Sequence, residues 1–257
     1  MTVQPPIRDY ALVGDCHGAA LVSSTGRIDW CALLRMDGDP VFFGLLDAAG
    51  GAWDVEPEDL VSVSRGYIPR TNILKTRFET ADGVLEVVDF MPVGRTRTAG
   101  THDYVSLNAP GWLVRRFRCT AGRVRLASRF RPRREGFRRD ALALTFAEDR
   151  IACETGLTLW HGGTAERAED GAVVHLALSE GECETLVLTR VPPLVDPRTR
   201  ADDLLATTEA FWREWSDYNR YRGPYGEAVS RSALVLKLLT YAPAGAIVAA
   251  ATTSLPE

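Results

Sequence analysis

The feature that most constrains the fold is a long succession of short apolar or alternating segments between residues 8 and 191, separated by turn residues. The segments recur about every 8–12 residues, which is the spacing typical of an all-β sandwich or barrel. About a dozen strands are expected, which is too many for one small barrel and suits two packed sheets. We therefore predict a mainly β fold: a large two-sheet antiparallel super-sandwich, followed by C-terminal helices.

Turn residues locate the expected strands. Three hairpins are predicted: residues 19–23 with 28–32, residues 73–78 with 84–88, and residues 113–118 with 124–126. Their turns are Ser24-Thr25-Gly26, Asp82-Gly83 and Ala121-Gly122. Asp-Gly is the strongest of these signals because both residues tolerate the positive φ of a tight hairpin turn. A second Asp-Gly, at 170–171, precedes a strand expected at 172–178, and an apolar strand at 185–189 is expected to be central in its sheet.

The pattern changes at Pro192-Pro193. These prolines and Asp196-Pro197 predict a stiff extended connector, because proline lacks the N–H that a strand or helix uses. An amphipathic helix follows, with one face at helical spacing formed by Leu204, Thr208, Phe211, Trp215 and Tyr218.

The second predicted helix, residues 227–241, is apolar almost all round and is expected to be buried on several sides. No partner helices follow it before residue 257, so we expect the chain to be the front part of a longer protein. The side chains expected to face missing helices are those of Phe211, Trp215, Leu234, Leu236, Leu238 and Leu239.

Composition narrows the class of protein. The chain has 257 residues, of which 46% are apolar and 25% charged, as in ordinary globular proteins. A net charge of −4 gives no reason to expect a nucleic-acid or membrane partner, and no apolar run is long enough to cross a bilayer. The five cysteines have no CxxC spacing and the four histidines are widely separated, so no metal, disulfide or cofactor is expected. Free cysteines and the lack of a signal sequence predict a cytoplasmic protein.

Segments near both ends of the chain carry a family resemblance. At the N-terminal end these are residues 7–16, 19–23, 26–30 and 35–37. At the C-terminal end they are residues 221–225, 231–243, 245–250 and 252–257. Together they resemble bacterial family 15 glycoside hydrolases, the trehalase and glucoamylase-like enzymes. Residues 95–200 contribute little beyond a β pattern.

The resemblance implies a domain organisation and an activity. Residues 1–195 correspond to an N-terminal β-sandwich, 196–226 to a helical linker, and 227–257 to the first helix and following segment of an (α/α)6 catalytic barrel. The family hydrolyses α-glucosidic bonds with inversion, using two glutamates in the barrel. Both are expected beyond the end of this chain, so no catalytic residue is assigned and the chain alone is predicted to be inactive. The implied partners are the barrel itself and an α-glucoside such as trehalose or a maltooligosaccharide.

Four residues are candidates for positions near the substrate. By resemblance, residues 246–254 run along the mouth of the barrel, which makes Thr252, Thr253 and Ser254 substrate-proximal; tight packing between helices is the alternative. Asp37 is the fourth candidate, because it lies near Trp30, and an aromatic ring beside a carboxylate suits sugar binding. Trp30 itself is in a predicted strand, so core or inter-domain packing is expected for it.

Two departures from the family bear on these candidates. The family commonly has proline at the position of Ala251 and Pro-Arg-Phe-Asp at residues 34–37, so the two local loops are expected to differ from the family's. Glu257 is interpreted as a linker carboxylate and not as a general acid, since glycoside hydrolysis needs a facing pair of carboxyl groups.

Residues 112–139 contain eleven arginines and one acid, Glu135. One interpretation is an exposed strand face whose charge is balanced by acids elsewhere, which the alternation at Arg123-Val124-Arg125 favours. The other is a basic groove for a polyanion, with phenylalanines between the arginines. Two alternatives to the hydrolase therefore stay open: a non-catalytic carbohydrate-binding or scaffold sandwich, and a polyanion binder that uses these Arg-rich strands.

Overall fold

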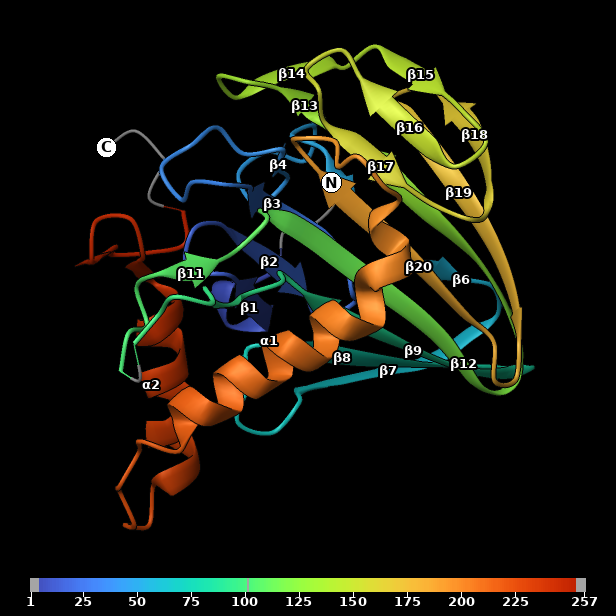
Figure 1. Ribbon diagram of the computed structural model, residues 1–257. Coiled ribbons are helices and arrows are strands. Elements are labelled where there is room, and N and C mark those ends of the chain that lie inside the picture. Colours follow the sequence, from blue (N-terminus) through green and yellow to red (C-terminus); the bar gives the residue numbers. More distant parts are fainter. Residues whose placement is uncertain (1–4, 101, 253–257) are drawn as a thin grey trace.

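The computed structural model describes residues 5–100 and 102–252. Strands dominate them, and two helices near the C-terminal end cover one side of the β structure (Figure 1). The prediction of a mainly β, antiparallel fold followed by helices is confirmed.

The strands pair into two antiparallel sheets that are joined through one long strand, β12 (Trp112–Arg131). The A sheet has the order β1-β2-β3-β5-β12-β19-β18, with β4 on β3 and β6 on β12. Its other strands are β1 (Tyr10–Gly14), β2 (Ala19–Ser23), β3 (Ile28–Ala32), β4 (Phe42–Phe43), β5 (Ala52–Trp53), β6 (Glu56–Pro57), β18 (Thr164–Ala168) and β19 (Gly171–Ser179). The B sheet has the order β7-β8-β9-β12-β20-β17-β16-β15. Its other strands are β7 (Leu60–Tyr67), β8 (Leu74–Thr80), β9 (Gly83–Phe90), β15 (Leu144–Phe146), β16 (Arg150–Cys153), β17 (Thr158–Trp160) and β20 (Cys183–Thr189).

Short elements complete the fold. Three small hairpins are β10 (Gly94–Arg95) with β11 (Leu107–Asn108), β13 (Arg133–Arg134) with β14 (Arg138–Ala141), and β21 (Thr240–Tyr241) with β22 (Ala246–Ile247). The 3-10 helices are η1 (Ile7–Asp9) and η2 (Pro197–Arg200), and the α-helices are α1 (Ala201–Ser216) and α2 (Gly226–Leu238).

The predicted hairpin at Ala121-Gly122 is wrong, because the chain continues as one strand through this point. The first half of β12 pairs with β9 and β20 in the B sheet, and its second half pairs with β19 in the A sheet. Gly122 has φ 65°, and the register shifts between Cys119 and Ala121. A bulge with a glycine at positive φ bends a strand. Here the bulge bends β12 so that the strand continues from the B sheet into the A sheet and does not reverse direction.

The other predicted hairpins form, and β20 lies centrally between β12 and β17 as expected. Gly26 turns β2 into β3 with φ 79°. The glycines of the two Asp-Gly pairs act differently: neither Gly83 nor Gly171 has a positive φ. A Cβ on Gly83 would lie 2.5 Å from the Ala121 carbonyl oxygen, and one on Gly171 would lie 2.2 Å from that of Phe130. Both glycines are therefore required by the close approach of β12.

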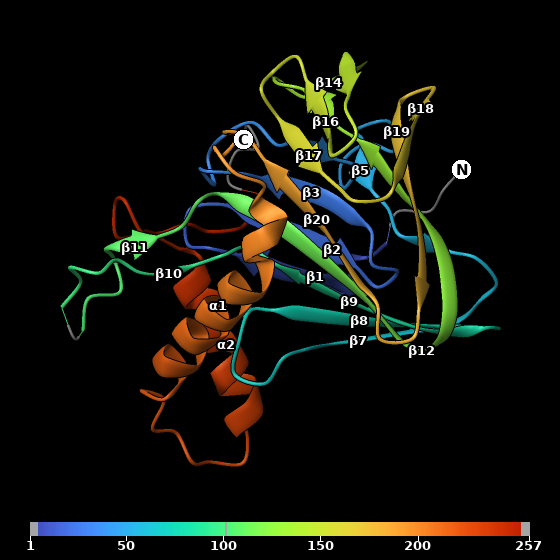
Figure 2. The same cartoon turned by 45° about the vertical axis from the view of Figure 1, so that its right-hand side comes forward.

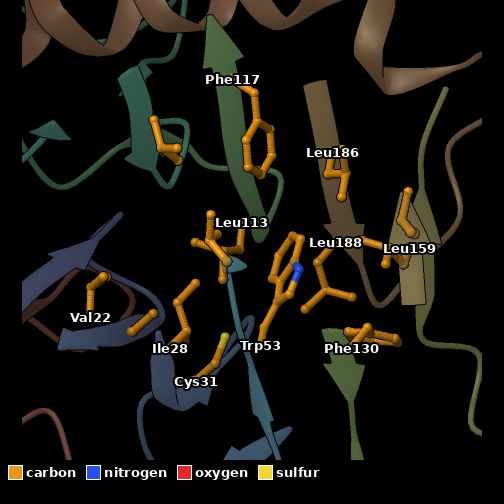
Figure 3. Packing of buried hydrophobic residues seen from close by; sticks show 14 of the residues in the cluster. Val22, Ile28, Cys31, Trp53, Leu113, Phe117, Phe130, Leu159, Leu186 and Leu188 are labelled. Atoms are coloured by element: carbon orange, nitrogen blue, oxygen red, sulfur yellow. The ribbon is translucent and has the colours of Figure 1, made fainter. Parts of the chain in front are cut away.

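The inter-sheet core lies between the facing sides of the two sheets. It combines Val22, Ile28 and Cys31 of the A sheet with Leu113, Phe117, Leu186 and Leu188 of the B sheet. The indole of Trp53 points between Leu113 and Leu188 (Figure 3). Inward positions alternate along β19, where Ala172, Val174, Leu176 and Leu178 belong to this core.

One buried ion pair interrupts this apolar layer. Arg115 and Asp89 are directly opposite each other on β12 and β9, and both side chains are fully buried. Two bonds join them, from Arg115 Nε to Asp89 Oδ1 (2.8 Å) and from Nη2 to Oδ2 (3.2 Å). The guanidinium also donates to the carbonyl oxygens of Trp53 (3.0 Å) and Gly26, both on the A-sheet side. Arg115 therefore ties the two sheets together, and its contact with Asp89 opposes the rise that burial causes in the pKa of Asp89.

The helices create a second core on the outer face of the B sheet, which we call the helix-covered core. Phe211 and Trp212 of α1 pack there with Phe90, Val114 and Val187. Leu234 and Leu238 of α2 belong to the same cluster.

Two expectations about the helices need correction. Helix α2 ends at Leu238 instead of Tyr241, because the chain reverses into the β21–β22 hairpin. Phe211, Leu234 and Leu238 are buried within the described residues, Trp215 and Leu239 are half-buried, and Leu236 is 53% exposed. Helix α2 is therefore buried along one side only. Of the leucines expected to face missing helices, Leu234, Leu238 and Leu239 pack in the helix-covered core instead.

Candidate functional site

Three segments distant in sequence meet at one end of the A sheet. They are the β1–β2 turn (residues 15–18), the β3–β4 loop (33–41) and the C-terminal segment (239–252), which together we call the rim. The Ala242 N–H donates to the Cys16 carbonyl (2.9 Å), and Trp30 Nε1 donates to the Ala251 carbonyl (3.1 Å). The β3–β4 loop, drawn in blue, and the C-terminal segment, drawn in red, lie on the same side of the molecule in both views (Figures 1 and 2).

The rim holds two of the four predicted substrate-proximal residues. Asp37 is exposed on the β3–β4 loop, and Thr252 is half-buried at the end of the C-terminal segment. Both are thus brought to the same end of the sandwich, although no contact joins their side chains. Thr253 and Ser254 lie outside the described residues.

Asp37 forms a two-bonded pair with Arg35. Arg35 Nε lies 2.9 Å from Asp37 Oδ1, and Nη2 lies 2.6 Å from Oδ2. This hydrogen-bonded guanidinium lowers the pKa of Asp37 below its ordinary value. Met36, between them, is buried in the helix-covered core. The loop is therefore anchored by its apolar residue and presents a charged pair to solvent, which can accept and donate hydrogen bonds.

Trp30 has the structural role expected of it. Its side chain is completely buried, and its ring lies 6.2 Å from that of Phe137. The hydrogen bond from its indole to Ala251 attaches the C-terminal segment to β3.

Sequence reasoning missed two residues of the rim, His17 and Tyr241. Their rings meet edge to face with centroids 6.2 Å apart. His17 follows Asp15, whose side chain caps the β1–β2 turn. An Asp followed three residues later by Gly18 is a recognisable turn signal and could have directed attention to this histidine. Nothing in the sequence pattern places Tyr241 beside it.

The buried acidic side chains of the described residues are all engaged in structural contacts. They are Asp15, Asp29, Asp54 and Asp89. Asp29 accepts from Tyr10 Oη (2.9 Å) and contacts Arg27, and Asp54 contacts Arg131 Nη2 (2.7 Å). Asp15 holds a turn, and Asp89 is paired with Arg115. These contacts give the four aspartates a structural role. An inverting hydrolase instead needs two carboxyl groups that face each other across space for a water molecule.

Most of the Arg-rich segment is paired with acids. Eight of its eleven arginines contact an acidic side chain: Arg115, Arg116, Arg125, Arg129, Arg131, Arg133, Arg134 and Arg139. Arg115 lies in the inter-sheet core, and Arg116 reaches Asp202 on α1. The acids supply the balancing charge that the strand-face interpretation requires, and they leave the polyanion groove with little unopposed positive charge.

Among residues 5–100 and 102–252, no three His, Cys, Asp or Glu side chains gather in a way that could hold a metal ion. Neither α-helix of this described part has the length and apolar character needed to cross a bilayer.

Comparison with known proteins shows what the whole chain resembles. This chain is similar to trehalases. It is 32% identical to the trehalase of Mycobacterium tuberculosis and 31% identical to that of Mycolicibacterium smegmatis, in each case over 98% of its length. It is 28% identical to the trehalase of Thermoplasma volcanium, again over 98% of its length. No protein-family model matches the chain.

The coverage of these alignments is asymmetric. Nearly all of this chain aligns, including residues 95–200, where the sequence pattern alone indicated only strands. The chain spans about 40% of the length of these trehalases. The similarity therefore extends along nearly all of this chain, including its sandwich, α1 and α2, and relates it to a portion of a trehalase.

Proposed function

We propose that this chain is the N-terminal part of a trehalase-like glycoside hydrolase of family 15 that cleaves α-glucosidic bonds with inversion. The observation that carries the proposal is the similarity to trehalases along 98% of the chain. In this proposal residues 1–195 are the β-sandwich domain, 196–226 the linker, and 227–257 the start of the catalytic (α/α)6 barrel.

Trehalose is the proposed substrate, since each of the three relatives is named a trehalase. A maltooligosaccharide is the second candidate, because the wider family includes glucoamylase-like enzymes. The two catalytic glutamates are proposed to lie outside residues 1–257. The engagement of all four buried acids of the described residues in structural contacts supports this assignment.

The rim is the part of this chain that we propose to face the substrate. It joins loops of the sandwich to the segment after α2, so it is placed where the sandwich and a following domain would meet. Asp37 and Thr252, and by the same proposal Thr253 and Ser254, would form one side of the mouth. The exposed Arg35–Asp37 pair offers donors and acceptors suited to sugar hydroxyls.

The test is a hybrid enzyme in which this chain replaces the aligned portion of the Mycobacterium tuberculosis trehalase. We expect the hybrid to release glucose from trehalose with inversion at the anomeric carbon, followed by NMR, and the 257-residue chain alone to show no turnover. A folded hybrid that lacks turnover would support the non-catalytic scaffold or carbohydrate-binding alternative. Turnover by the chain alone, abolished by a point substitution within it, would contradict the proposed location of the glutamates.

A further inference from the structure

The β1–β2 turn of the rim is built around a buried carboxylate. Asp15 is completely buried, and its Oδ1 accepts the backbone N–H groups of His17 (2.9 Å) and Gly18 (2.7 Å). Its other oxygen, Oδ2, has no hydrogen-bond partner among the described residues. Burial of the group raises its pKa above the ordinary value, and the two backbone N–H groups oppose that rise. The turn is thus held by a carboxyl group whose burial, with one oxygen lacking a hydrogen-bond partner, costs free energy.

The residue between Asp15 and His17 is also held in an unfavourable conformation. Cys16 has φ 64°, in the left-handed region that a residue with a side chain rarely adopts. Its carbonyl accepts from Ala242 of the C-terminal segment, and its sulfur lies 3.5 Å from the carbonyl oxygen of Lys237 on α2, so both elements fix the turn from outside. Leu34, in the neighbouring β3–β4 loop of the rim, has φ 67°. Backbone strain of this kind concentrates at sites where a side chain must be presented in one particular way.

The side chain presented by this turn is His17. Its Nδ1 lies 3.2 Å from the Asp15 carbonyl oxygen. In a neutral ring, an Nδ1–H directed at that carbonyl leaves Nε2 as the hydrogen-bond acceptor. The ring is half-buried, and Tyr241 supports it edge to face. The exposed Arg35–Asp37 pair lies on the β3–β4 loop of the same rim.

We propose that His17 contacts the saccharide, with Nε2 accepting a hydrogen bond from a sugar hydroxyl, and that Asp15 is a positioning residue that sets the orientation of the ring. The inference rests on the proposed function and adds a specificity residue to it. Trehalose offers only hydroxyl groups and ether oxygens, so an imidazole nitrogen that accepts a hydrogen bond, on the same rim as a guanidinium and a carboxylate, matches its chemistry. The strained turn fixes that acceptor before the sugar arrives, which reduces the entropy lost on binding.

The first test is a trehalose titration of the 257-residue chain, followed by NMR of labelled histidine rings. We expect the His17 signals to shift progressively and those of His102, an exposed histidine on the β10–β11 connection, to stay in place. Maltose serves as the second probe and reports whether the contact distinguishes the two disaccharides. Equal shifts of both histidines, or no shift of His17, would overturn the proposal.

The second test uses the hybrid enzyme and separates binding from chemistry. His17→Ala is expected to raise KM for trehalose by about tenfold, the effect of losing about one hydrogen bond, with kcat within about twofold of the parent. His17→Gln retains a polar group near the position of Nε2 and should restore most of the affinity, whereas His102→Ala should leave KM unchanged. Asp15→Asn keeps the Oδ1 acceptor and should resemble the parent, while Asp15→Ala should resemble His17→Ala.

The outcomes distinguish this inference from the function on which it rests. A hybrid that hydrolyses trehalose with the same KM after His17→Ala refutes the role of His17 and leaves the proposed function intact. A hybrid that is folded by circular dichroism and lacks turnover refutes the proposed function, and the NMR titration of the chain then decides the role of His17. If the hybrid does not fold, the NMR titration of the chain decides the role of His17 by itself.

Discussion

The two cores of this protein are built from different kinds of contact. The inter-sheet core joins strands whose inward residues alternate regularly, and it has one buried ion pair at its centre. The helix-covered core joins residues that are far apart in the sequence, such as Ala19 with Leu238 and Phe90 with Trp212. The rim that we propose to be functional borders the helix-covered core, where Cys16, Met36 and Ala251 are buried. The difference teaches that the sandwich has a core of its own, while the site depends on the docking of the last quarter of the chain.

The largest effect is expected from breaking the ion pair of the inter-sheet core. Arg115→Met leaves Asp89 buried without a partner, so the free energy of unfolding should fall by about 3–5 kcal/mol. Denaturant titration measures the loss. The double variant Arg115→Met with Asp89→Leu removes both charges and should recover much of the stability. A single variant as stable as the parent would show that the sheets do not depend on this contact.

The helix-covered core is probed next by Trp212, which is fully buried beneath α1. Trp212→Ala should lower stability by about 3–5 kcal/mol, because a large cavity forms. The half-buried Trp215 on the same helix is the matched control and should cost clearly less. Hydrogen exchange then sharpens the comparison: loss of protection confined to α1 and α2 would show that the two cores unfold separately, and uniform loss would show one cooperative unit.

Two nearby leucines of α2, one buried and one exposed, allow a paired comparison with a smaller expected loss of stability. Leu238→Ala removes a fully buried side chain from contact with Gly14 and should cost about 2–4 kcal/mol. Leu236→Ala changes a side chain that is 53% exposed and should stay within about 0.5 kcal/mol of the parent. Thermal unfolding compares the two directly. Equal costs would mean that the exposed face of α2 is covered in solution, which this chain alone does not explain.

Two aspartates of the rim should show opposite dependence on pH. The pKa of Asp15 is raised by burial, so its ionisation opposes folding and its contribution to stability falls as pH rises above the ordinary value of about 4. Asp15→Asn should therefore gain stability relative to the parent as the pH rises above ~4. The pKa of Asp37 is lowered by Arg35, so its contribution is present above the ordinary pKa and is lost as pH falls; Asp37→Asn should show the opposite trend. Unfolding curves at several pH values check both signs.

The smallest effect on stability is expected for Asp37→Ala. The pair with Arg35 is solvent-exposed, and exposed ion pairs contribute little to the free energy of unfolding. In the hybrid enzyme the same substitution should alter KM or kcat for trehalose if the rim faces the substrate. Unchanged kinetics after substitutions at both His17 and Asp37 would reduce the rim to a scaffold.

Parts of the fold could be predicted from the sequence because they depend on neighbours in the chain. Alternation of side chains located β2, β3, β8 and β9, and helical spacing located α1. Acids contact most arginines of the Arg-rich segment, as the strand-face interpretation requires, but Arg115 is fully buried and does not belong to an exposed face. Its inward direction follows from the register of β12, which places it between Leu113 and Phe117 on the face that the A sheet covers.

For the site, the sequence alone placed Trp30 in a strand with core or inter-domain packing and Asp37 a few residues further along the chain. Only the tertiary structure decided that Gly122 bends a continuous strand, that α2 stops at Leu238, and that His17 meets Tyr241. The physical reason is the range of the interactions. Turns, caps and periodicity arise from residues a few positions apart, whereas the rim is closed by hydrogen bonds between residues more than 200 positions apart, such as Trp30 with Ala251 and Cys16 with Lys237.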